Sequence, residues 1–311
     1  MDFLANYFGS LNPMSFLSAL PGNIAQGIIW GLMGLGVFLT FKLLNFADLS
    51  VDGSFATGGA VTAVMLINGC PVWATIIVAI LAGLAAGLVT GLLHTLLGIP
   101  DILAGILTQI ALYSINLNIM GKSNLPISYR NYTLVVSASN INMAILVGLG
   151  ICAVVIAAMY WYFGTEQGST IRSTGSNPAM SKAQGININF TKVIALALSN
   201  GLVALSGSLF AQYQGFADIN MGRGAIVIGL AAVIIGEVLG EAIFRKHMNF
   251  IIRMLFVIVG GILYYIAMGI VLWLKMPTDD TKLFTAIIVA IFLAVPYLQK
   301  RERLHSRKLQ K

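Results

Sequence analysis

Long apolar runs recur along the whole chain, and each is about as long as a membrane span. An α-helix needs about 20 apolar residues to cross a bilayer. Only 9% of the 311 residues are charged, against roughly a quarter in soluble domains. Such a chain cannot cover itself with polar side chains, so we expect an all-α, polytopic membrane protein with about 8–10 transmembrane helices. Candidate spans lie near residues 24–44, 52–68, 73–97, 101–120, 142–163, 191–212, 224–240, 251–274 and 283–299.

The two ends of the chain differ from this pattern. Residues 1–21 are interrupted by Asn12, Pro13 and Pro21, and we expect a short helix lying along the membrane surface rather than a span. The tail at 301–311 is basic, as is typical of a segment that follows a last span at an anionic membrane surface. We prefer this interpretation of the tail to nucleic-acid binding. A membrane domain at 22–300 remains between the two ends.

Lys and Arg suggest an orientation, because basic residues accumulate on the cytoplasmic side of membrane proteins. If the polar loop at 165–190 is cytoplasmic, alternation of the spans puts most basic residues on its side. That side holds Lys42, Arg172, Lys182, Lys192, Arg245, Lys246, Arg253, Lys300, Arg301, Arg303, Arg307, Lys308 and Lys311. The other side holds Lys122, Arg130, Arg223, Lys275 and Lys282. The sequence therefore predicts a multi-pass protein of the bacterial cell membrane with a cytoplasmic C-terminus.

One segment appears twice. The sequence "NFADLSVDGSFATGGAVTAVML" at 45–66 is similar to "GFADINMGRGAIVIGLAAVIIG" at 215–236. Both begin with an FAD triplet, continue through a Gly-bearing polar turn and end in a small-residue apolar run. Five candidate spans, from 52–68 to 191–212, separate the copies, so they enter the membrane from opposite faces. This parity is typical of the inverted repeats of transporters, although chance similarity between Gly-rich spans is the alternative.

Polar side chains beside or within spans are candidates for a solute pathway, because they are costly in lipid. One group surrounds the repeated segments, and another forms a stripe on the span at 101–120 with spacings of four and three residues. The alternatives are that Asp48 and Asp218 cap the helices that follow them, and that the stripe bonds to neighbouring helices. The candidates are Asn45, Asp48, Asp52, Asp218 and Arg223 in the first group, and Gln109, Tyr113 and Asn116 in the second.

A different face is marked by Gly83, Gly87 and Gly91, which are four residues apart. Residues at this spacing share one side of a helix, and small residues there let another helix approach closely. We expect these glycines to serve helix packing and not chemistry.

Signatures of catalysis are missing from the sequence. It has no GxxxxGK[ST] phosphate-binding loop and no G-x-S-x-G nucleophile turn. His94, His247 and His305 are too far apart to suggest a metal site. We therefore expect a protein that is not an enzyme and that binds no cofactor or metal itself.

The longest internal polar stretch, "TEQGSTIRSTGSNPAMSKAQGIN", covers residues 165–187. Ser169 or Thr170 could cap a helix, and Asn177 followed by Pro178 is typical of a second helix start. Gly185 could end that second helix. The pattern predicts two short helices that project from the membrane as a docking surface for a soluble partner, with a plain connecting loop as the alternative.

The same stretch resembles the coupling loop of ABC-importer permeases of the branched-chain amino acid and ribose type. The resemblance rests on Gly168, Ile171, Arg172, Gly175, Asn177, Ser181, Gly185, Ile186 and Asn187. "NFADLSVDGSF" is similar to the motif that follows the first span of these permeases. "ILAGILTQIALYSINLNIMGKSNLPI" at 102–127 resembles the tryptophan/tyrosine-type subgroup, which works with a lipoprotein binding protein. The resemblance extends over about residues 22–300.

The resemblance implies an ABC-importer permease domain that works as a homodimer. Each loop at 165–190 would sit on an ATPase subunit, which binds ATP and Mg²⁺ on another chain. An extracellular binding protein would deliver the solute, an amino acid and in this subgroup an aromatic one. Sugar or nucleoside cargo is an alternative, as are an ion- or proton-coupled secondary transporter using Asp48, Asp52 and Asp218, and a membrane protein without transport. The implied coupling residues are Glu166, Arg172, Gly175, Ser176, Asn177, Pro178, Ser181, Lys182, Gly185 and Asn187.

Overall fold

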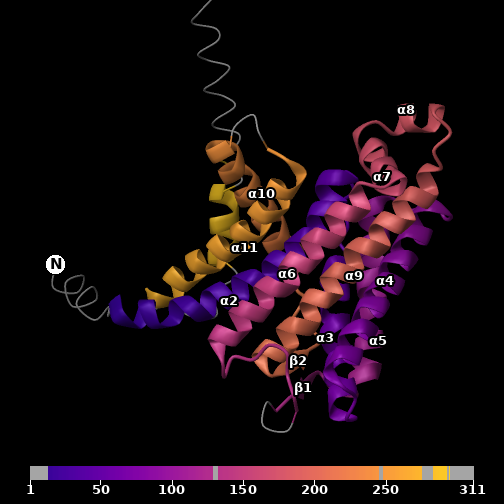
Figure 1. Ribbon diagram of the computed structural model, residues 1–311. Coiled ribbons are helices and arrows are strands. Elements are labelled where there is room, and N and C mark those ends of the chain that lie inside the picture. The colour runs from indigo at the N-terminus through magenta and orange to yellow at the C-terminus, as the bar shows by residue number, and fades with distance from the viewer. Residues whose placement is uncertain (1–12, 129–131, 245–247, 275–282, 293, 295–311) are drawn as a thin grey trace, which may run out of the picture.

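The protein is a bundle of long helices (Figure 1). The computed structural model describes residues 13–128, 132–244, 248–274, 283–292 and 294. The first helix, α2, continues directly into a π-helix, η1. The apolar elements are α2 (Pro13–Val37), η1 (Phe38–Leu43), α3 (Val51–Ile67), α4 (Val72–Thr95), α5 (Asp101–Met120), α6 (Ile141–Phe163), α9 (Ile188–Gln214), α10 (Ala225–Phe244), α11 (Phe250–Trp273) and a shorter helix at Leu283–Phe292.

Seven helices within the described residues are long and apolar enough to cross a membrane. The all-α polytopic fold is confirmed, but two of the nine candidate spans are shorter apolar helices, α3 and Leu283–Phe292. α3 is short because it begins inside the bundle. Its N-cap residue, Ser50, donates a hydrogen bond to Asn200 near the middle of α9. The hydropathy of the sequence could not distinguish this 17-residue helix from a full span.

The expected break at residue 21 is wrong. α2 begins at Pro13 and runs through Pro21 without ending, so residues 13–21 belong to the first long helix and form no separate surface segment. Proline is well tolerated in the first turn of a helix, where its missing N–H has no intrahelical partner, and Pro13 occupies the first position. Residues 1–12 and the basic tail at 301–311 lie outside the described residues.

The bundle has two distinct ends (Figure 1). At the first, which we call the loop end, lie two short helices, α7 (Glu166–Ser176) and α8 (Pro178–Ala183). At the second, the strand end, β1 (Asn124–Pro126) pairs antiparallel with β2 (Phe216–Asp218), and Leu125 lies opposite Ala217. α9 runs the length of the bundle between the two ends, because it begins after α8 and ends just before β2.

α4 and α9 touch backbone to backbone through the three glycines at positions 83, 87 and 91. A Cβ added at Gly83 or Gly87 would overlap the carbonyl oxygen of Asn200 or Leu196, respectively, and one at Gly91 would lie 2.8 Å from the Cα of Val193. Close packing of this kind stabilises helix pairs in lipid, where the hydrophobic effect gives little drive for association. The glycine face predicted from the sequence therefore packs against α9.

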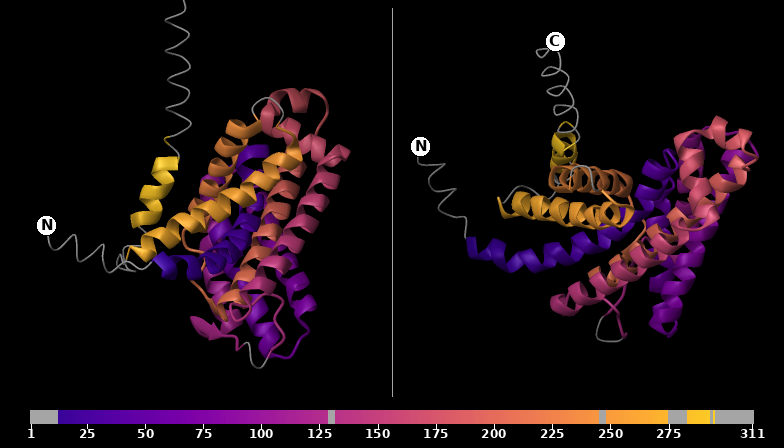
Figure 2. Two further views of the ribbon diagram at one scale, coloured as in Figure 1. Left: turned by 60° about the vertical axis from the view of Figure 1, so that its left-hand side comes forward. Right: turned by 45° about the horizontal axis from the view of Figure 1, so that its top comes forward.

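Aromatic rings join α2, α3 and α9 in the core. The Trp30 ring stacks on Phe55 with the ring centroids 4.7 Å apart, and it meets Phe210 edge-on at 5.2 Å. α2 also packs against α10 and α11. In the views of Figure 2 it therefore links one group of helices, α10 and α11, to the other group around α9.

The repeated segments run in opposite directions. α4 ends at the loop end, where His94 bonds to Lys192 in the first turns of α9, so α3 before it ends at the strand end. α10 instead ends at the loop end, because Phe250, the first residue of α11, lies beside Arg172 of α7. α3 and α10 thus diverge from the middle of the bundle, which agrees with the predicted inverted repeat.

Candidate functional site

The polar loop at the loop end folds as two capped helices. The Thr165 hydroxyl accepts a hydrogen bond from the N–H of Gly168 and begins α7. Asn177 caps α8 by accepting from the N–H of Met180 at 3.1 Å, and Pro178 is its first residue. The predicted pair of helices is confirmed, but the proposed caps Ser169 and Thr170 are wrong, because both lie inside α7.

The loop returns to the membrane through Gly185, the predicted end of the second helix, and through a cap at Asn187, which was not predicted from the sequence. Gly185 has a φ of +83°, a left-handed conformation that favours glycine. Asn187 then caps α9, and its side chain accepts from the N–H of Phe190 at 3.1 Å. Gly185 and Asn187 set the backbone conformation of the loop, which explains why these residue types occur in the coupling pattern.

Two residues of the coupling pattern fasten α7 to the bundle. The Arg172 guanidinium donates to the carbonyl oxygen of Phe163 at 3.0 Å and lies 6.0 Å from the Phe250 ring centroid. A cation is favourable there, because the carbonyls at the end of α6 carry partial negative charge. A Cβ at Gly175 would overlap the carbonyl oxygen of Leu43, so α7 lies directly on the end of η1. A displacement of α7 would therefore act on α6, α11 and η1 together.

The outermost part of the loop is α8 and the turn before it. Ser181 is buried and its carbonyl oxygen accepts from the N–H of Ile186 at 3.1 Å, whereas Met180 is 59% exposed. An exposed Met beside a Lys is the kind of adaptable surface that a partner protein can cover. The predicted coupling residues that are exposed are Glu166, Arg172, Ser176, Asn177, Pro178, Lys182, Gly185 and Asn187.

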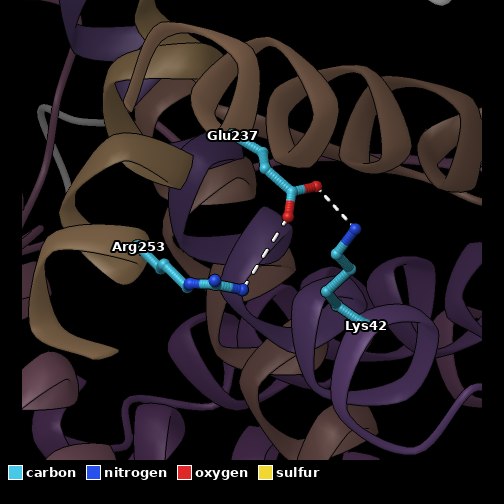
Figure 3. A network of polar contacts seen from close by, with 3 residues as sticks. All are labelled: Lys42, Glu237 and Arg253. Atoms are coloured by element: carbon cyan, nitrogen blue, oxygen red, sulfur yellow. Dashed lines mark ion pairs between the residues drawn. The ribbon is translucent and has the colours of Figure 1, made fainter. Parts of the chain in front are cut away.

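An ion cluster joins η1, α10 and α11 (Figure 3). Glu237 of α10 pairs with Lys42 of η1 at 2.6 Å and with Arg253 of α11 at 3.8 Å. The cluster connects η1, which precedes the first repeated segment, to α10 and α11. In the sequence, Lys42 and Arg253 indicate only orientation, and Glu237 carries no signal because its partners are far away along the chain.

The two FAD triplets make the same turn at different depths. Asp48 accepts a hydrogen bond from the N–H of Ser50 at 2.9 Å, and Asp218 accepts one from the N–H of Asn220 at 2.7 Å. Asp48 is fully buried, and its other oxygen accepts from the Asn200 amide at 2.8 Å. The capping alternative is wrong for both aspartates, because the N-cap of α3 is Ser50, which makes no side-chain cap bond, and Asp218 ends β2 well before α10 begins at Ala225. Asp48 instead closes an Asx-type turn ahead of α3. Asn45, with a φ of +55°, is an exposed turn residue before this segment.

Asp52 connects the two repeats. Its two carboxylate oxygens accept from the N–H groups of Gly224 and Ile226, both at 2.9 Å. These N–H groups lie at the start of α10, where a helix has unpaired donors and a partial positive charge. A carboxylate in the first turn of α3 thus caps the matching helix of the other repeat.

A cavity of about 280 Å³ lies beside this cap, between α3, α5 and the segment before α10. Five of the candidate pathway residues line it: Asp52, Gln109, Tyr113, Asn116 and Arg223. Asn45, Asp48 and Asp218 do not line it, so the structure does not group them with this cavity. The remaining lining residues, Gly53, Ala56, Ile110 and Ile219, were missed by sequence reasoning because small and apolar residues carry no signal in an apolar span.

Comparison with known proteins identifies the family to which this chain belongs. The family described as "Branched-chain amino acid transport system / permease component" matches residues 22–296. The chain belongs to this permease family. It is therefore a membrane-spanning permease subunit of an ABC transport system, and the family excludes the alternatives of a secondary transporter and of a protein without transport.

Individual relatives cover most of the permease. It is 43% identical over 279 residues to the tyrosine transport system permease protein of Clostridioides difficile, covering 89% of this chain and 91% of the relative. It is 27% identical to the D-allose transport system permease protein of Escherichia coli, covering 82% and 77%. The solved structure of PsaBC from Streptococcus pneumoniae in complex with Fab has the same fold, with a TM-score of 0.52, 16% identity and 94% of both chains covered.

Proposed function

We propose that this permease imports an aromatic amino acid, with tyrosine as the best candidate. The observation that carries the proposal is the 43% identity to a tyrosine transport permease over nearly the full length of both chains. The D-allose relative is much more distant, at 27% identity. Sugar cargo is therefore the weaker alternative.

The energy would come from an ATPase subunit that docks on the exposed surface of α8. This surface is polar around an exposed Met180 and carries Lys182 in the last turn of α8. α7 is fastened to α6, η1 and α11 by Arg172 and Gly175, so closure of the ATPase would be transmitted to those helices.

The loop end would face the cytoplasm. Lys42, Arg172, Lys182, Lys192 and Arg253 belong to elements at this end, whereas Lys122 follows α5 near the strand end. This imbalance supports a cytoplasmic loop, because positive charge is retained on that side. An extracellular binding protein would then release the amino acid at the strand end.

A second copy of the chain would complete the pathway. The cavity beside Asp52 is open, because Tyr113, which lines it, is 44% exposed. The same face of α5 carries exposed Ile102, Leu103 and Ile110. Lipid alone would make a poor wall for a polar solute, so a homodimer that buries this face is the arrangement that the cavity needs.

Copurification with the ATPase tests the docking and the orientation together. Lys182→Glu and Met180→Glu change exposed side chains of α8 without touching the Arg172 anchor. We expect both to release the ATPase while the permease stays monodisperse. Lys122→Glu makes the same charge change near the strand end and serves as the matched control. Release by Lys122→Glu alone would place the ATPase at the wrong end and contradict the proposal.

Uptake tests the substrate. The permease, its ATPase and its binding protein in proteoliposomes should accumulate labelled L-tyrosine when ATP is enclosed with the ATPase. An unlabelled aromatic amino acid should compete, and D-allose should not. Uptake of the sugar with no uptake of tyrosine would overturn the substrate assignment.

A further inference from the structure

The most unusual polar group in the membrane part of the permease is the side chain of Asn116. It is 1% exposed, and neither its amide nitrogen nor its amide oxygen has a hydrogen-bond partner among the described residues. Buried amides are almost always paired, because an unpaired one is costly in an apolar environment. Asn116 also lines the cavity beside Asp52. Each of these two atoms has less than 1 Å² of accessible surface, and a rotation of the Asn116 side chain would present the unpaired amide to a molecule in the cavity.

The opposite region of the cavity carries charge of both signs. Asp52 accepts one N–H at each oxygen from the start of α10, which leaves further lone pairs for another donor. Arg223 lines the same cavity next to Gly222, which lies against the backbone of Asp52. Neither charge takes part in the ion pairs found among the described residues. A zwitterion could meet both charges at once, whereas a neutral sugar has no group for either.

The separation of these two regions follows from α5. A Cβ at Gly53 would lie 3.1 Å from the Cα of Gln109, so the charged region is level with Gln109. Asn116 follows seven residues later, roughly 10 Å along the helix axis. This span is comparable to the length of a tyrosine molecule from its α-carbon groups to its phenol hydroxyl. Tyr113 and Ile110 line the cavity between the two regions and suit the faces of an aromatic ring.

We propose that this cavity binds an aromatic α-amino acid with a ring hydroxyl, which pairs with Asn116 while Arg223 holds the carboxylate and Asp52 the ammonium group. The inference rests on the proposed function and deepens it, because it gives the permease a substrate site of its own. Selection would then occur twice, once in the binding protein and once in the membrane. The cavity volume of about 280 Å³ suits one small solute at a time.

Direct binding tests the site without the binding protein. The permease–ATPase complex in lipid nanodiscs is titrated with labelled L-tyrosine and, separately, with L-phenylalanine. We expect wild type to prefer tyrosine by about fivefold, the usual weight of one neutral hydrogen bond. Asn116→Leu should abolish this preference, whereas Asn118→Leu, an exposed position on the same helix, should retain it. Asn116→Ala gives the same reading if the leucine variant does not assemble.

A second pair of variants tests the charged end. Arg223→Gln should weaken the binding of both amino acids roughly tenfold, as expected for a lost charge-assisted contact, and should leave tyramine, which has no carboxylate, unaffected. Lys122→Gln should leave the binding of all three ligands unchanged. A structural role of Arg223 would weaken all three ligands equally and would overturn its assignment.

The same preparation separates failure of this inference from failure of the proposed function. If wild type transports tyrosine with its binding protein but the Asn116 variants keep the wild-type ratio of tyrosine to phenylalanine, the cavity is no recognition site and the proposed function stands. The same conclusion follows if transport occurs without saturable binding. If wild type neither binds nor transports tyrosine, both proposals are wrong.

Discussion

Gly175 offers the most direct test of how the loop is connected to the bundle. Gly175→Ala adds a methyl group where it would overlap the carbonyl oxygen of Leu43 and lie 2.9 Å from the Cα of Leu44. These are backbone atoms, which cannot rotate away as a flexible side chain can. We therefore expect α7 to lift from η1, at the usual overpacking cost of about 1–3 kcal/mol.

That cost corresponds to a roughly 5- to 150-fold shift away from the docked loop. In proteoliposomes that contain the complete importer, we expect tyrosine uptake per ATP hydrolysed to fall, while the ATPase still copurifies through α8. The thermal midpoint of the permease in detergent should fall as well.

Two control substitutions isolate the cause. Gly150→Ala adds the same methyl group in open space within α6 and should leave the permease unchanged. Gly185→Ala adds it in open space at a φ of +83°, so it introduces only backbone strain of about 1 kcal/mol. If Gly175→Ala keeps the wild-type uptake per ATP and thermal midpoint, the close contact between α7 and η1 does not transmit motion and the reasoning fails.

Three further changes test the bundle. Asn200→Ala removes a donor from buried Asp48 and should lower the free energy of unfolding by about 2–3 kcal/mol; an unchanged urea midpoint in detergent would contradict this. Gly87→Leu should force α4 from α9 and lower the thermal midpoint far more than Gly150→Ala does, and equal midpoints would contradict the close packing. Glu237→Gln should cost less than about 1 kcal/mol, because Lys42 is partly exposed; this small difference should vanish in high salt, and its persistence would indicate a buried pair.

The parts that could be predicted from the sequence are those set by local composition. Apolar length identified the long helices, and the sequence Asn177-Pro178 located the start of α8 because a cap followed by proline has few other uses. Pro21 was misleading, because proline usually marks the end of a helix, whereas α2 continues through it. The bounds of α3 were predicted to within one residue, but its assignment as a full span failed, since only the contact with Asn200 shows that it starts inside the bundle.

The candidate site was partly visible in the sequence. The polar stripe on α5 identified Gln109, Tyr113 and Asn116, because polar side chains are costly in a membrane helix unless they contact protein, water or a solute. Their meeting with Asp52 and Arg223 depends on packing between distant segments, which one sequence does not reveal. The same holds for Asp48, whose acidic character suggested a pathway but whose donors are Ser50 and Asn200.

The long-range partners of the two aspartates set an order for biogenesis. Asp48 and Asp52 are made early, but their donors Asn200, Gly224 and Ile226 follow 152, 172 and 174 residues later. At roughly 5–20 residues per second, synthesis of that interval takes about 10–30 seconds. During that time the nascent first half carries two acidic side chains near the membrane without the groups that stabilise them. The α3 segment must therefore wait beside water or the insertion machinery until the second half arrives, and a chain truncated before α9 should be a target for membrane proteases.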